Sequence, residues 1–189
     1  MDAFAYLSVL LSIILGLAIT QVLQGYRGLL LSRSRVVLHT PTMIWSALLL
    51  VFAAQLWWAS FGLANHKEWD FGTFAVILLQ TVLLYMMSAI VLPDVAIEGR
   101  VNLHDHYYRE VVPFFTTSLL MLAASIGKDW MLNHRLPQPT NLAFHGFFAV
   151  MATLAIVSRK PRVHLFIAFA MVLFSIAYVA MLFARLGES

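Results

Sequence analysis

The sequence predicts an all-α polytopic membrane protein, a bundle of six transmembrane helices that forms a single membrane domain over residues 1–189. Composition is the first observation: 61% of the residues are hydrophobic, only 11% are charged, and the mean hydropathy is +0.84. Soluble domains carry about 25% charged residues. The second observation is the placement of the charges. Every Lys, Arg, Asp and Glu lies outside or at the ends of six apolar segments, which cover residues 3–25, 43–64, 71–92, 111–132, 141–157 and 163–184.

The length and pattern of these segments favour helices over strands. Each segment is close to the roughly 20 residues that a helix needs to cross a bilayer. Strands of a membrane barrel would alternate polar and apolar residues, and these segments do not. Because the six segments take up most of the chain, little of it is left for a soluble domain.

The positive charges predict the orientation of the bundle. The loops at 26–42, 93–110 and 158–162 would share one side and hold eight Lys and Arg residues, whereas the other side holds four. Positive residues concentrate in cytoplasmic loops, so these loops are expected in the cytoplasm and both termini on the non-cytoplasmic side. The pI of about 9.5 mostly reflects this bias, so no nucleic-acid partner is expected. The short loops suit a bacterial cytoplasmic (inner) membrane.

The first span carries a row of small or polar residues at every fourth position. The row, here called the α-helical ridge, comprises Ser8, Ser12, Gly16 and Thr20 and continues through Gln24, Gly28 and Ser32. Four residues turn a helix by roughly 400°, so the row winds slowly around it. Small residues let a second helix approach closely in lipid. We therefore expect the other helices to pack against this one.

The next elements follow from charge, proline and turn signals. Residues 26–42 are basic and amphipathic, which predicts a helix that continues past the headgroups or lies on the inner leaflet. Pro41 then stands near the start of the second span, where its missing N–H is tolerated. The short segment Asn65 to Asp70 predicts that the second and third spans are antiparallel neighbours.

The second half of the chain is read in the same way. Pro93 is expected to end the third span, the cytoplasmic loop then covers 93–110, and the fourth span is expected to begin after Pro113. The short basic turn Ser158 to Arg162 predicts an antiparallel hairpin of the last two spans.

Polar side chains inside the spans are the first candidate functional set. They are Thr20, Gln21, Gln24, Gln55, Gln80, Tyr85, Ser88 and His145. They could line a path for a solute, or they could simply form hydrogen bonds between helices, worth about 0.6 kcal/mol each. No Asp, Glu, Lys or Arg lies in a span core, which argues against a proton-coupled transporter and a voltage sensor.

The second candidate set lies in the loop before the fourth span. His104, Asp105, His106 and Glu110 have side chains that bind Zn²⁺, Fe²⁺ or Mn²⁺, and His106 and Glu110 would share a face if the segment were helical. The spacing matches no known metal motif. The alternative is a solvated interfacial helix whose acids pair with Arg100 and Arg109. No cofactor is expected, and the absence of cysteine excludes thiolate chemistry.

These observations lead to three functional hypotheses. The first is a non-enzymatic homo-oligomer in the lipid bilayer that passively conducts a small solute or ion. The second is an accessory or scaffold subunit of a larger membrane complex. The third is a metal-dependent membrane enzyme that uses residues 104–110. A P-loop, a nucleophile elbow and a metalloprotease motif are all absent from the sequence, which favours the first two.

Overall fold

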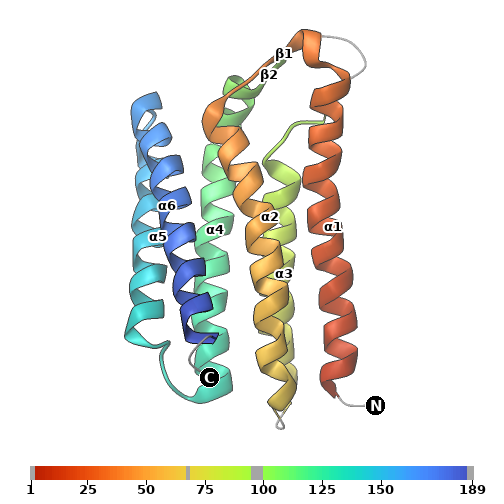
Figure 1. Cartoon of the computed structure of the whole chain (residues 1–189), viewed down its shortest axis with the longest axis vertical. Coiled ribbons are helices and arrows are strands. Elements are labelled where there is room, and N and C mark those ends of the chain that lie inside the picture. Colours follow the sequence, from red (N-terminus) through yellow and green to blue (C-terminus); the bar gives the residue numbers. More distant parts are fainter. Residues whose placement is uncertain (1–2, 67–68, 95–99, 187–189) are drawn as a thin grey trace.

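The computed structural model describes residues 3–66, 69–94 and 100–186, and most of these residues are helical. The six long helices are α1 (Ala3–Leu31), α2 (Thr40–Ser60), α3 (Phe71–Ile90), α4 (Leu103–Asn133), α5 (Pro139–Val157) and α6 (Pro161–Leu186). They form an up-and-down bundle in which α1 begins and α6 ends at the same end (Figure 1). All six are long and apolar enough to cross a membrane, which agrees with the predicted all-α bundle of six helices.

A pair of two-residue parallel strands closes the other end of the bundle. Strand β1 (Val36–Val37) precedes α2, and strand β2 (Val101–Asn102) precedes α4. Val36 is paired with Val101, and Val37 with Asn102. The pair therefore holds the N-terminal ends of α2 and α4 next to each other (Figure 1). This end of the bundle is called the β end below.

Two helices are longer than the sequence predicted. Helix α1 continues past residue 25 to Leu31, as the first of the two alternatives for 26–42 predicted, but the rest of this segment forms a 3-10 turn at Arg33–Arg35, strand β1 and the start of α2. Helix α4 begins at Leu103 rather than near 111, so part of the predicted loop 93–110 is helical.

The early start of α4 has a clear local cause. The side chain of Asn102 accepts a hydrogen bond from the backbone N–H of His104 at 3.0 Å, which caps the helix. Proline is disfavoured in a helix interior because it lacks an N–H and its ring crowds the preceding turn. Pro113 nevertheless lies inside α4, so the prediction that the span begins after it was wrong.

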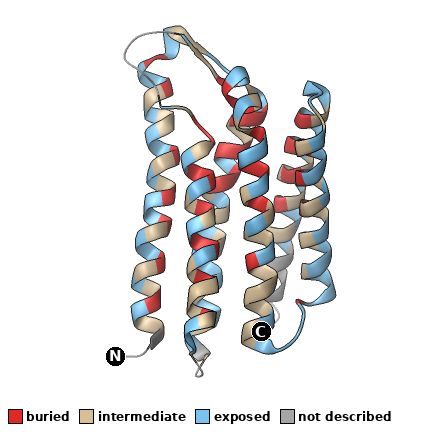
Figure 2. Cartoon of the chain, turned by 180° about the vertical axis from the view of Figure 1, so that it is seen from behind, coloured by how far each residue is buried: buried red, intermediate tan, exposed pale blue. Residues whose placement is uncertain are grey.

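The order of packing differs from the order along the chain. Helix α3 packs most extensively against α4 and then α1, although the predicted contacts of α2 with α3 and of α5 with α6 are also present. Helices α2 and α4 are both central, because α2 contacts α1, α3, α4 and α6, and α4 contacts α2, α3 and α5. Buried residues lie on the inward faces, and many gather toward the β end (Figure 2). There Trp45 of α2 packs edge-on against Phe114 and Phe115 of α4, with ring centroids 5.6 and 5.2 Å apart.

The middle of the α-helical ridge does not pack against the rest of the protomer as expected, whereas Ser8 and Gly28 are half-buried and Ser32 is buried. Helix α1 buries a different, leucine-rich face, which includes Leu7, Leu11 and Leu15. Ser12, Gly16 and Thr20 are exposed instead, and a Cβ atom at Gly16 would meet nothing within 4 Å. The leucine face of α1 is buried against α3 because leucines fill the space between two helices better than small residues do.

Close approach to α1 occurs at a glycine outside the ridge. A Cβ atom at Gly25 would lie 2.8 Å from Cβ and 2.6 Å from Cδ1 of Leu92, the residue that follows α3 closely. Contacts this short require the backbone to move. Gly25 therefore permits the junction between α1 and the end of α3.

We predict that Gly25→Ala destabilises the protein. Alanine favours a helix by up to about 1 kcal/mol over glycine, but at this position the gain is opposed by overlap with Leu92. Gly146→Ala is the matched control, because Gly146 also lies in a long helix and its Cβ would meet open space. Thermal unfolding in detergent should give a lower Tm for Gly25→Ala than for Gly146→Ala. Equal Tm values would contradict the close approach.

Candidate functional site

The N-terminal ends of α2, α4 and α6 meet at the β end and bring together five rings. This imidazole–phenol cluster comprises His39, His104, Tyr107, Tyr108 and His164. His39 precedes α2, three members lie in the first two turns of α4, and His164 lies in the first turn of α6. Residues separated by up to 125 positions in the sequence, from 39 to 164, thus form one site.

The parallel strands place His39 beside His104. Each histidine lies two residues after a paired strand residue, because Val37 is paired with Asn102. The two imidazole rings are 5.1 Å apart and nearly perpendicular. His39 also lies 4.9 Å from the ring of Tyr107. The register of two short strands therefore determines which rings of α2 and α4 meet.

A hydrogen-bonded chain runs through the buried side of the cluster. The hydroxyl of Tyr107 lies 2.9 Å from Nδ1 of His164, and Nε2 of His164 lies 2.7 Å from the carbonyl oxygen of Ser158. A carbonyl only accepts, so Nε2 carries the proton and the Tyr107 hydroxyl donates to Nδ1. His164 is fully buried and uses both ring nitrogens. It therefore ties α4 to the turn between α5 and α6.

His39 is held as a neutral ring. Its Nδ1 lies 2.9 Å from the hydroxyl of Thr42, which donates in turn to the carbonyl of Leu103 at 3.4 Å. Burial, together with repulsion from His104 and then His164, lowers the pKa of His39 from 6.5 to about 4. The imidazole of His39 is therefore uncharged at neutral pH.

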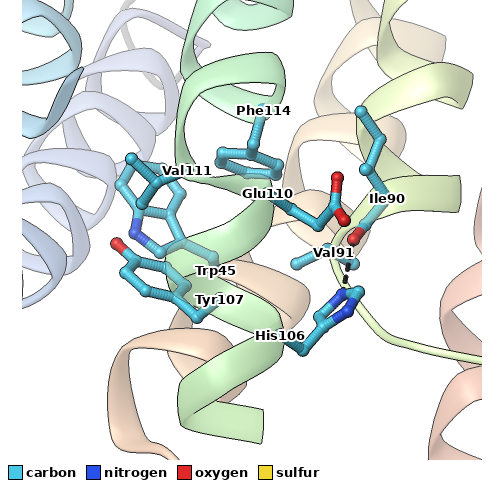
Figure 3. Close-up of a pocket in the computed structure, with 8 residues that line it drawn as sticks. All are labelled: Trp45, Ile90, Val91, His106, Tyr107, Glu110, Val111 and Phe114. Atoms are coloured by element: carbon cyan, nitrogen blue, oxygen red, sulfur yellow. Dashed lines mark hydrogen bonds between the residues drawn. The ribbon is translucent and has the colours of Figure 1, made fainter.

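The predicted metal ligands do not converge on one point. His106 points toward the end of α3, where its Nε2 donates to the carbonyl of Ile90 at 2.9 Å (Figure 3). Its Nδ1 lies 3.1 Å from a guanidinium nitrogen of Arg109, so both ring nitrogens are used. Glu110 accepts from the Nε of Arg109 at 2.9 Å.

The other two predicted ligands form a separate pair. Nδ1 of His104 lies 3.2 Å from the carboxylate of Asp105, and both side chains are largely exposed. The part of the chain that the structure describes contains no group of three His, Cys, Asp or Glu side chains placed to hold a metal ion. The acids pair with neighbouring side chains instead, Glu110 with Arg109 and Asp105 with His104 and Asn102.

The polar side chains inside the spans are distributed rather than gathered. Gln21 of α1 donates to the hydroxyl of Tyr85 of α3 at 3.4 Å, a contact between helices. His145 bonds to the carbonyl of Asn141 and, at 3.1 Å, to the hydroxyl of Ser125.

The remaining members of this set show three kinds of environment. Thr20 and Ser88 bond to carbonyls of their own helices, at 2.7 and 3.0 Å. Gln55 and Gln80 each have one buried amide atom without a hydrogen-bond partner among the described residues, and Gln80 is only 6% exposed. Gln24 is exposed. Among the hydrogen bonds of the described residues, only that of Gln21 with Tyr85 joins two members of the set.

The imidazole–phenol cluster contains residues that sequence reasoning missed. His39, Tyr107, Tyr108 and His164 were not among the candidate residues predicted from the sequence. The sequence offered one usable signal, the position of each histidine within a few residues of the start of an apolar segment. Comparison of the chain with protein-family models, with curated proteins and with solved structures gives no match.

We predict that acid destabilises the folded protein through His39. Between pH 6.5 and about 4 the unfolded chain protonates His39 and the folded chain does not, so stability is present above pH 6.5 and is lost as the pH falls through this window. The partial exposure of the ring limits the effect to about 1 kcal/mol. The decrease in Tm from pH 7.5 to pH 5.0 should be smaller for His39→Gln than for the wild type.

The control for this prediction is His134→Asn. His134 is exposed and has a φ of 48°, a conformation that asparagine tolerates. This variant should show the same decrease in Tm as the wild type. A His39→Gln variant that kept the full decrease would contradict the assignment.

Proposed function

We propose that the protein is a non-enzymatic, homo-oligomeric protein of the bacterial cytoplasmic membrane that conducts a small solute or ion passively between its protomers. One observation carries the proposal: the middle of the α-helical ridge, from Ser12 to Gln24, faces outward. Ser12, Gly16, Thr20 and Gln24 are exposed on α1. The β end, which holds Arg33, Arg35 and the turn Ser158 to Arg162, would face the cytoplasm.

Outward exposure of small and polar residues favours association in lipid. A row of small residues allows a second helix to come close enough for extensive van der Waals contact and hydrogen bonds. The open space around Gly16 is what such an approach requires. Ser12 accepts a hydrogen bond from Nε1 of Trp57 at 3.3 Å, so the surface extends from α1 onto α2. A second copy would cover polar groups that otherwise face hydrocarbon.

The distribution of polar groups supports conduction between protomers rather than through one protomer. Inside the protomer these groups bond to their own helix or to single neighbours, as Ser88 and Gln21 do. Two pockets of the structure lie toward the β end. A path between protomers, with Thr20 and Gln24 on its wall, agrees better with these facts than a path through one protomer.

The mass of the solubilised particle tests the assembly. Native mass spectrometry should give a defined oligomer for the wild type and smaller particles for Gly16→Leu, because leucine fills the space that a second helix needs. Gly146→Leu is the control, since Gly146 is exposed on α5 and its Cβ would also meet open space. It should retain the oligomer. A lone wild-type protomer would contradict the proposal and favour the accessory-subunit hypothesis.

Conduction has its own test in proteoliposomes. Light scattering after an osmotic step should show faster entry of glycerol, or a fluorescent dye should show faster K⁺ flux, than in vesicles without protein. Gln24→Leu should slow the flux because it removes an exposed amide from the proposed path. Rates equal to those of empty vesicles for both probes would count against conduction and leave the assembly intact.

A further inference from the structure

An open pocket lies at the β end between the first turns of α4 and the turn that leads into α6. It is lined by His104, Asp105, Tyr108, Arg159 and Pro161 and has a volume of about 430 Å³. Ligand pockets in proteins are commonly about 300–1,000 Å³. The hydrogen-bonded chain of Tyr107 and His164 belongs to the neighbouring buried side of the cluster, so neither the cluster nor the conduction proposal accounts for this pocket.

Arg159 presents hydrogen-bond donors at the pocket. Its Nη1 donates to the backbone carbonyl of Tyr108 at 2.7 Å, which holds the guanidinium beside α4. Its other N–H groups have no partner among the described residues, and no carboxylate there forms an ion pair with it. The planar fork of a guanidinium matches two oxygens of a carboxylate or a phosphate.

The charges around the pocket favour an anion. Lys160 and Arg162 flank Pro161 and are exposed. Helix α6 starts at Pro161 and is 26 residues long, so the positive end of its dipole also faces this region. The opposing charge is that of Asp105. Its two carboxylate oxygens already accept from Asn102 at 2.7 Å and from His104 at 3.2 Å.

The wall of the pocket is partly aromatic. The ring of Tyr108 lies 4.8 Å from that of His104 and 5.1 Å from that of His164. The Tyr108 hydroxyl is buried and has no hydrogen-bond partner in the part of the chain that the structure describes. The ring of Tyr108 gives the pocket a flat apolar surface beside the guanidinium of Arg159.

We infer that this pocket binds a phosphate-class oxyanion, with Arg159 as the principal ligand and Lys160 and Arg162 as supporting charges. The pocket lies at the first residues of two apolar helices, Leu103 and Pro161, which is the level of lipid headgroups in an inserted bundle. The phosphate of an anionic lipid and a soluble phosphate group offer the same chemistry to these residues. The inference does not depend on the oligomeric state.

Lipid binding is tested by titrating the detergent-solubilised protein with phosphatidylglycerol and counting bound lipids by native mass spectrometry. Arg159→Gln should weaken binding about tenfold, which corresponds to the loss of a charge-assisted hydrogen bond. Phosphatidylcholine should bind more weakly than phosphatidylglycerol to the wild type. Arg135→Gln is the charge-matched control, because Arg135 is exposed and lies at the opposite end of the bundle, and it should bind like the wild type.

Because Arg159 also bonds to the carbonyl of Tyr108, Arg159→Gln can lower stability. A second variant therefore tests the charges separately. Lys160→Gln combined with Arg162→Gln removes only exposed charges and should weaken phosphatidylglycerol binding several-fold at an unchanged Tm.

Binding of a soluble ligand is tested by measuring the Tm in the presence of inorganic phosphate at millimolar concentration. A rise in Tm that is lost in Arg159→Gln, without preferential binding of phosphatidylglycerol, would assign the site to soluble phosphate. Equal lipid binding by wild type, Arg159→Gln and the double variant, together with no phosphate effect on Tm, would overturn the inference. Equal weakening by Arg135→Gln would do so as well, because it would indicate unspecific charge attraction.

Discussion

The parallel pairing of β1 with β2 is the constraint on which the β end depends. Two residues on each side, Val36–Val37 and Val101–Asn102, join segments that are 65 positions apart in the sequence, from Val36 to Val101. The entropy of closing such a loop grows only slowly with its length, so a short pairing supported by buried rings can hold it. The register then determines that His39 meets His104 and that α2 and α4 start side by side. The buried chain through His164 adds α6 to this arrangement.

Polar groups find hydrogen-bond partners differently at the β end, along the spans and on the outer face of α1. At the β end, polar side chains pair across helices, as Tyr107 does with His164, and caps satisfy helix termini, as His106 does for the carbonyl of Ile90. Along the spans, hydroxyls bond mostly to their own helix. On the outer face of α1 the exposed groups have little cover from the protomer. This contrast motivates separate proposals for assembly along α1 and for anion binding at the β end.

Hydropathy and charge placement were sufficient to predict six helices that are long and apolar enough to span a membrane, because the cost of burying a charge in lipid keeps charged residues out of such segments. The start of α4 was harder to predict. Pro113 indicated a helix that begins after it, whereas the structure begins the helix at Leu103, after the cap at Asn102. Strands of two residues have no periodicity to detect, so the meeting of His39 with His104 was not predictable. His104 and His106 were read as neighbours in one site, but two residues separate side chains by about 200° around a helix. Their rings accordingly face Asp105 and α3.

The most direct test of the β-end arrangement is a cross-link across the parallel pair. The chain has no cysteine, so Val36→Cys combined with Val101→Cys introduces the only two thiols. Paired residues of adjacent strands lie about 5 Å apart, which suits a disulfide. After mild oxidation in membranes, mass spectrometry should show this pair bonded and the off-register pair Val36→Cys with Leu103→Cys largely free. Free thiols in the first variant, or preferential bonding in the second, would contradict the register and with it the placement of His39 beside His104.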